Sequence, residues 1–145
     1  MAAECTTQGL TEDHRRCDHL LALVEDAATG SDWQALAAQA RALTEAIHAH
    51  FRFEEGHLFA PLEARSPFAA GPVSVMRSEH EQIRQLSSQL EDAAGARDSD
   101  ECRGILETLH PLNVQHNGKE EAVLYPLADR TPGNQAESLL ELPHA

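Results

Sequence analysis

The chain of 145 residues is poor in aromatic side chains and in positive charge. Aromatic residues make up only 4% of the sequence, which argues against a β-sandwich, whose core is rich in such side chains. Lys and Arg number 11 against 24 Asp and Glu, and the formal net charge is −13. Because this charge repels nucleic acid and anionic membrane lipids, neither is an expected partner.

Long apolar runs and paired cysteines are also missing. Residues 1–16 contain no apolar stretch of the length that a signal peptide requires, and no segment approaches the roughly 18 apolar residues of a membrane helix. We therefore expect a cytoplasmic protein. The three cysteines are odd in number and have no short paired spacing, which argues against a disulfide scaffold. Cys17 and Cys102 are interpreted as small buried hydrophobes, and Cys5 as an exposed residue.

The chain does contain an internal repeat. When the sequence is shifted against itself by 66 positions, 12 of the 45 residues between positions 14 and 58 meet an identical residue. The matches include the residues best able to bind a metal: His14 meets His80, His50 meets His116, and Glu54 meets Glu120. Each copy of the repeat therefore carries one lone histidine and one His-x-x-x-Glu-Glu motif.

Apolar stripes with helical spacing predict four long helices. Caps, glycines and prolines bound them at about residues 11–30, 31–60, 73–95 and 98–127. The first should begin at Thr11, the second should be capped by Ser31, and the last should be kinked at Pro111. The pattern predicts an all-α, up-down-up-down antiparallel bundle made of two repeated helix hairpins. We expect an N-terminal extension (1–10), the bundle (11–130) and a loosely held C-terminal tail (131–145).

The repeated histidines and glutamates occupy inward positions of these helices. Residues four apart share a helix face, so each His-x-x-x-Glu pair presents an imidazole and a carboxylate to the core. Two ionised carboxylates buried together would repel, at a cost of several kcal/mol, unless cations bind between them. A shell of imidazole and carboxylate suits iron, with manganese and zinc as alternatives. The predicted ligands are His14, His50, Glu54, His80, His116 and Glu120.

The competing interpretation is a core in which the histidines form hydrogen bonds to glutamates. The alignment of six such residues, in three pairs at one offset, disfavours it. Glu55 and Glu121 lie about 100° around the helix from the ligands and are interpreted as outer-shell or surface residues. His57 is interpreted as a partly buried polar residue, with a hydrogen bond to the site as the alternative. Tyr125 is interpreted as an aromatic cap at the end of the bundle, with a hydrogen bond to a ligand as the alternative.

Residues 50–61 and 116–126 resemble the paired signature of the hemerythrin-like, HHE cation-binding family. With His14 and His80, the resemblance spans about residues 10–130. It implies a four-helix bundle that holds two non-haem irons with a bridging oxo or hydroxo group, with the two glutamates bridging the ions and the four histidines as terminal ligands. Ferritin-like bundles also hold two irons, but they use Glu-x-x-His, in which the order is reversed.

The oxygen-carrying hemerythrins have a further histidine four residues from the one on the third helix, where this chain has Met76 and Arg84. They also end their last motif with His-x-x-x-x-Asp. The set of four histidines and two glutamates is closest to the di-iron domain of the proteins for repair of iron centres, which are linked to nitrosative stress. Those proteins usually carry an extra cysteine-containing N-terminal domain, and only ten residues precede the first predicted helix here.

The resemblance implies a protein that binds a diatomic ligand, nitric oxide or oxygen, in a nitrosative or oxidative stress response. The alternatives are an iron or redox sensor that acts as an interaction module, and delivery of iron to damaged iron centres. Because the sequence identifies no proton-relay residue, it leaves open whether the protein is an enzyme.

Overall fold

The computed structural model describes residues 2–131, with side chains from residue 7 onward. The described chain forms four long rods, two of which continue through a π-helical turn. These rods are α1 (Ala2–Ala28); α2 (Trp33–Phe53), η1 (Glu54–Phe59) and α3 (Ala60–Arg65); α4 (Ala70–Gly95); and α5 (Ser99–Lys119), η2 (Glu120–Leu124) and α6 (Tyr125–Arg130).

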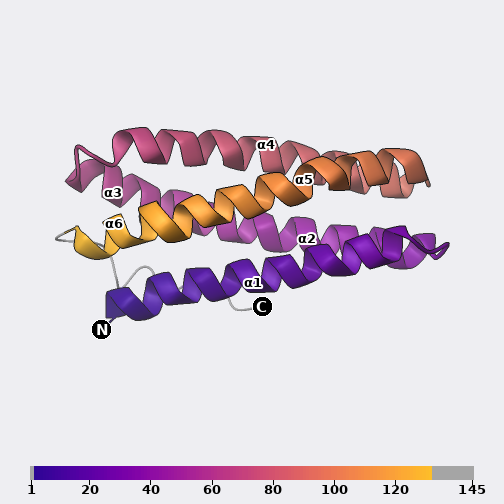
Figure 1. Cartoon of the computed structure of the whole chain (residues 1–145), viewed down its shortest axis with the longest axis horizontal. Helices are drawn as coiled ribbons and strands as arrows, with labels where there is room; N and C mark the ends of the chain where they lie inside the picture. The colour runs from indigo at the N-terminus through magenta and orange to yellow at the C-terminus, as the bar shows by residue number, and fades with distance from the viewer. Residues whose placement is uncertain (1, 132–145) are drawn as a thin grey trace.

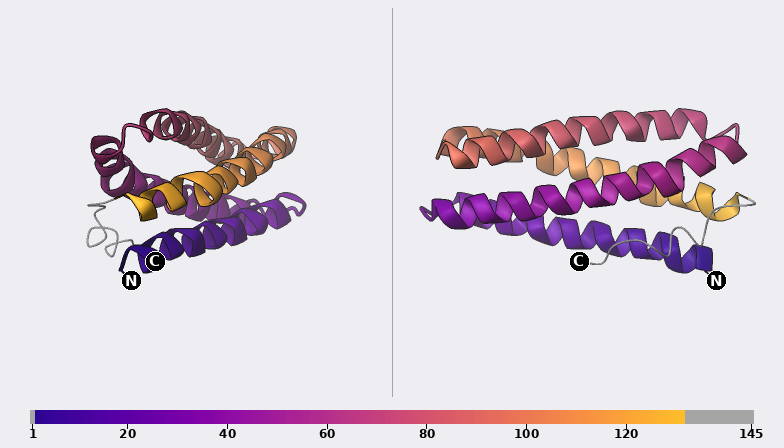
Figure 2. Two further views of the ribbon diagram at one scale, coloured as in Figure 1. Left: turned by 60° about the vertical axis from the view of Figure 1, so that its left-hand side comes forward. Right: turned by 180° about the vertical axis from the view of Figure 1, so that it is seen from behind.

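The rods run up, down, up and down along one common axis (Figure 1). α1 packs on α2, α2 on α4, and α4 on α5, and α5 closes the ring against α1. The view from behind shows the same antiparallel order (Figure 2). The predicted all-α four-helix bundle is thereby confirmed. Among the described helices, none combines the length and the apolarity needed to cross a bilayer.

The two hairpins are capped in the same way. Asp32 accepts a hydrogen bond from the backbone N–H of Ala35, and Asp98 accepts one from Glu101, at 3.0 and 3.1 Å. The start of the fourth helix at Asp98 is thus confirmed, whereas the expected cap at Ser31 is wrong by one residue. Asp32 and Asp98 are partners in the repeat, and both have the extended backbone that an N-cap requires.

The first helix begins much earlier than Thr11. The Thr11 hydroxyl does not cap a helix start but donates to the carbonyl of Thr7 one turn before, at 3.1 Å. The inward face also continues upstream, because Thr7 and Leu10 are buried at helical spacing from His14. Residues 2–10 are therefore part of α1 rather than a separate extension. The expected tail lies outside the described residues except for Thr131.

The second rod continues past Pro61, which was expected to end its helix, and the fourth rod continues past Pro126. Pro61 and Pro126 each lie in the first turn of a short helix that follows a π turn, where a missing N–H is tolerated. In η1 the N–H of Ala60 reaches the carbonyl of Glu55, and in η2 that of Tyr125 reaches Glu120. Pro111, where a kink was expected, lies inside α5, which is continuous from Ser99 to Lys119. π turns inside helices are frequent at functional sites.

The bundle core consists of two apolar clusters. One contains Leu21, Leu43, Leu90 and Leu109 and lies toward the two hairpin turns. The other contains Leu10, Phe59 and Leu124 and lies toward α3 and α6. The first also includes Cys17 and Cys102, which are buried free thiols, as the sequence predicted. Between the two clusters, the bundle contains a layer of buried histidines and glutamates.

Candidate metal centre

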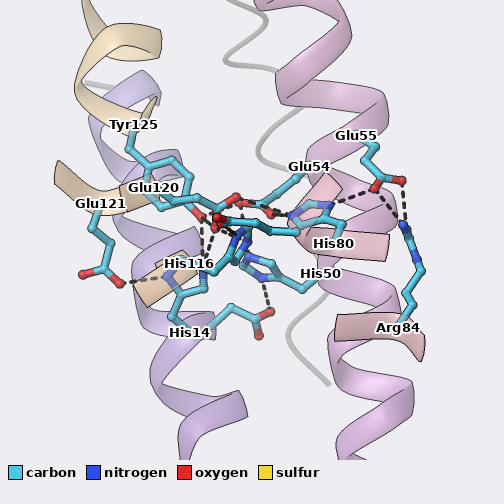
Figure 3. A network of polar contacts seen from close by, with 12 residues as sticks. His14, His50, Glu54, Glu55, His80, Arg84, His116, Glu120, Glu121 and Tyr125 are labelled. Carbon is cyan, nitrogen blue, oxygen red and sulfur yellow. Dashed lines mark hydrogen bonds and ion pairs between the residues drawn. The ribbon is translucent and has the colours of Figure 1, made fainter. Parts of the chain in front are cut away.

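The six predicted ligands meet in this layer (Figure 3). His14, His50, His80 and His116 come from the four long helices α1, α2, α4 and α5, and Glu54 and Glu120 are the first residues of η1 and η2. All six are at most 3% exposed. Their ligand atoms form two groups, each within 4.8 Å: His14 and His50 with both glutamates, and His80 and His116 with both glutamates.

Each of these histidines contacts a carboxylate through its Nδ1 atom. The pairs are His14 with Glu121 at 2.8 Å, His50 with Asp13 at 2.7 Å, His80 with Glu55 at 2.8 Å, and His116 with Glu79 at 2.8 Å. Because an ionised carboxylate can only accept, each Nδ1 carries the proton and donates it. Nε2 is therefore the atom of each ring that can bind a metal.

These carboxylates follow the internal repeat. Asp13 and Glu79 occupy equivalent positions in the repeat. Each accepts a hydrogen bond from the histidine of the next long helix, His50 or His116. Glu55 and Glu121 are also equivalent, and they accept hydrogen bonds from the lone histidines of α4 and α1. These contacts fit their interpretation as outer-shell residues. Sequence reasoning missed Asp13 and Glu79, because an aspartate over a glutamate does not count as an identity. Comparing the repeats by chemical type would have found this pair.

Three of the four carboxylates are in turn held by a cation. Arg16 Nε lies 2.8 Å from Asp13, Lys119 Nζ lies 2.5 Å from Glu79, and both outer nitrogens of Arg84 contact Glu55 at 2.9 and 2.8 Å. Although burial opposes it, the hydrogen bonds from His80 and Arg84 lower the pKa of Glu55 to about 2. A carboxylate held in this way stays ionised and fixed, and it fixes the imidazole that it contacts.

Five buried atoms at the centre lack hydrogen-bond partners. Within the described part of the chain, these are Nε2 of His50, His80 and His116, and one carboxylate oxygen each of Glu54 and Glu120. Nε2 of His80 lies 3.2 Å from the unpartnered oxygen of Glu54 without forming a hydrogen bond. Buried polar atoms are ordinarily paired, because an unpaired one costs the free energy of its desolvation. Two cations between these atoms would satisfy them, so the donor set fits a pair of metal ions.

Tyr125 reaches into the same layer. Its hydroxyl lies 2.5 Å from Glu54 Oε2, 3.2 Å from His14 Nε2 and 3.3 Å from Glu120 Oε1. Burial, and then the two carboxylates, raise the pKa of Tyr125 well above its ordinary value, so the phenol remains a neutral donor. The interpretation of Tyr125 as an aromatic cap is therefore incomplete. Its ring packs in the apolar cluster, as a cap would, but its hydroxyl also contacts the predicted ligands.

Met76 and Arg84 lie four residues on either side of His80, where the oxygen carriers have a further histidine. Neither belongs to the two groups of ligand atoms. Met76 is buried in the apolar cluster next to α3 and α6, and Arg84 holds Glu55. His57 is half-buried, and its ring packs against Phe53 with centroids 4.8 Å apart. Phe51 forms a wall of the centre, because it stacks on His80 at a centroid distance of 3.7 Å and an angle of 7°.

A cleft of about 230 Å³ opens beside the centre. Its lining consists of Thr7, Gln8, Thr11, Glu121, Tyr125, Pro126 and Asp129. Two of these, Glu121 and Tyr125, contact His14 directly. The cleft is thus separated from one of the two groups of ligand atoms by a single layer of side chains.

A model of the hemerythrin HHE cation binding domain matches residues 5–128, which is most of the chain and includes all six predicted ligands. No curated protein and no solved structure matches the chain significantly.

Proposed function

Because the chain belongs to the hemerythrin HHE cation-binding family, we propose that it holds two iron ions and binds a diatomic ligand, nitric oxide or oxygen, in a nitrosative or oxidative stress response. In this proposal the histidines are terminal ligands and the glutamates bridge the ions. The terminal ligands are His14, His50, His80 and His116, and the bridging ligands are Glu54 and Glu120.

The observation that carries the proposal is the convergence of unpartnered buried atoms. Imidazole Nε2 atoms and carboxylate oxygens face one another in two groups that share both glutamates. Sharing of this kind suits two ions, because each carboxylate can offer one oxygen to each group. Two irons held by a mixed imidazole and carboxylate shell would supply open positions for an exogenous ligand and electrons to reduce it.

The residues around the centre would hold it in place and control what reaches it. The four carboxylates on the Nδ1 atoms orient the imidazoles, and Phe51 and the apolar clusters limit water. Tyr125 lies on the side of the cleft, and its hydroxyl is within hydrogen-bond range of both glutamates that would bridge the ions. A diatomic ligand bound on this side would compete with Glu54 for the single O–H of Tyr125.

The even division of ligands favours nitric oxide over reversible oxygen carriage. Each group has two histidines and the two shared glutamates, so both ions would keep open positions. In an oxygen carrier, a fifth histidine saturates one iron, but neither Met76 nor Arg84 can supply it here. We therefore expect rapid oxidation of the reduced protein in air and a stable adduct with nitric oxide.

Optical and electron paramagnetic resonance spectra of the anaerobically iron-loaded protein test this proposal. Addition of nitric oxide should give a persistent new spectrum, whereas oxygen should convert the protein quickly to its oxidised form. Zinc-loaded protein is the control and should respond to neither gas. An oxygen-dependent spectrum that lasts for hours and is reversed under vacuum would instead indicate an oxygen carrier, and no response to either gas would contradict the proposal.

A further inference from the structure

The two halves of the centre differ in how firmly they hold their histidines. We propose that the ion bound by His14 and His50 exchanges with solvent metal through the cleft, while the ion bound by His80 and His116 is retained. Asp18 determines this difference. The inference rests on the proposed two-metal centre and adds an order in which its ions are bound and released.

The retained half contains a complete clamp on its lone histidine. Arg84 lies four residues after His80 on α4 and contacts both oxygens of Glu55, at 2.8 and 2.9 Å. Glu55 in turn holds His80 Nδ1 at 2.8 Å. The Arg84 guanidinium also lies over the ring of Phe51, 5.4 Å from its centroid. These contacts fix the carboxylate from two sides, so His80 has one stable orientation.

The repeat places an aspartate where the clamp of the other half would be. Asp18 lies four residues after His14, as Arg84 does after His80, and therefore occupies the position equivalent to Arg84. The counterpart of Glu55 is Glu121, which holds His14 Nδ1 at 2.8 Å. No described lysine or arginine forms an ion pair with Glu121, whose only ion-pair partner among the described residues is His14.

The charge of Asp18 also weakens the hold of Glu121 on His14. Partial burial raises the pKa of Asp18, the His14 imidazole acts against this rise, and the Glu121 carboxylate adds to it by repulsion between the two carboxylates. Asn113 holds Asp18 in place by donating to it at 3.2 Å. Glu121 is correspondingly the most exposed of the four orienting carboxylates, at 36% against 23% for Glu55.

The cleft supplies the route to solvent. Glu121 and Tyr125 line it, and behind them His14 Nε2 lies 2.9 Å from Glu120 and 3.2 Å from Tyr125. A movement of the Glu121 side chain into the cleft would release His14 Nδ1, so that the imidazole could turn and withdraw its Nε2 atom from the metal. The equivalent movement of Glu55 is opposed by two hydrogen bonds from Arg84.

Metal release from the zinc-loaded full chain tests the proposal. Two equivalents of zinc are bound, and excess pyridylazo-resorcinol is added to follow release by its colour. The wild-type protein should release one ion in a fast phase and the other in a slow phase. Asp18→Arg, which supplies the missing cation, should slow the fast phase by about tenfold, the lower end of the effect of partners that orient a ligating histidine. Asp18→Asn removes the repulsion without adding a clamp and should slow it less.

The reciprocal variant provides the matched control. Arg84→Asp puts the aspartate of the first half into the second, and it should speed the slow phase while leaving the fast phase unchanged. Native mass spectrometry of the mixture between the phases should show one retained zinc. Release of both ions in a single phase, or an unchanged fast phase in folded Asp18→Arg protein, would overturn the inference. If Asp18→Arg does not fold, an unchanged slow phase in Arg84→Asp overturns it. Binding of fewer than two zinc ions would instead contradict the proposed function.

Discussion

Replacement of Tyr125 with Phe tests the role of its hydroxyl without changing the packing of the ring. The ring lies in the apolar cluster with Leu10 and Leu124, whereas the hydroxyl donates to Glu54 at 2.5 Å. The other oxygen of Glu54 has no hydrogen-bond partner, so the variant leaves this buried carboxylate without any neutral donor. A hydrogen bond to a charged group contributes about 1.5–3 kcal/mol, and the metal-free variant should lose about 2 kcal/mol of unfolding free energy.

The metal-loaded variant should lose less, because bound ions would neutralise the Glu54 carboxylate. Urea unfolding of metal-free and zinc-loaded protein measures both losses, and an unchanged denaturant slope would show that only stability has changed. Thr44→Val is the control, because Thr44 has a buried hydroxyl that donates to the carbonyl of Ala40, at 2.9 Å. It should cost about 0.5–1.5 kcal/mol with or without metal. Equal losses for Tyr125→Phe in the two states would refute the reasoning.

Three further predictions concern pH, backbone and thiols. Although burial opposes the shift, neighbouring carboxylates raise the pKa of His50 and of His80 to about 10. The two protonated histidines should therefore stabilise the metal-free protein fully below about pH 6.5, and this stabilisation should be lost as the pH rises toward 10. Metal affinity should rise over the same range, which titration at several pH values checks, since binding displaces these protons. Arg97 has a φ of 57° at the end of α4, so Arg97→Gly should raise the unfolding free energy by about 0.5–1 kcal/mol. Burial raises the pKa of Cys17 to about 12 and also raises that of Cys102, so a thiol reagent should label neither until the protein unfolds.

The sequence was sufficient to find the residues that face the centre, because the repeat and the helix period act together. His14 and His80 are single residues, but their common offset from the His-x-x-x-Glu motifs identifies them. The α-helical period does not predict that Tyr125 faces the centre. Five residues after Glu120, an α-helix would turn its side chain about 140° away, whereas the π turn of η2 brings the Tyr125 hydroxyl to within 3.3 Å of Glu120.

The cations that hold the orienting carboxylates do not follow the repeat. Lys119 on α5 contacts Glu79 on the neighbouring helix α4, and its repeat partner is Phe53, so comparing the two copies gives no signal. Asp13 next to His14 also has a simpler reading, as an acidic residue near a helix start. The structure is needed to show that its carboxylate points to His50 instead.

The number of ions that the chain holds tests the central claim most directly. Iron analysis and native mass spectrometry of anaerobically loaded protein should give two irons per chain, because both glutamates belong to both groups of ligand atoms. Glu54→Ala and Glu120→Ala should each abolish the paired centre. A single iron in the wild-type protein, or two magnetically coupled irons retained by either variant, would contradict the account.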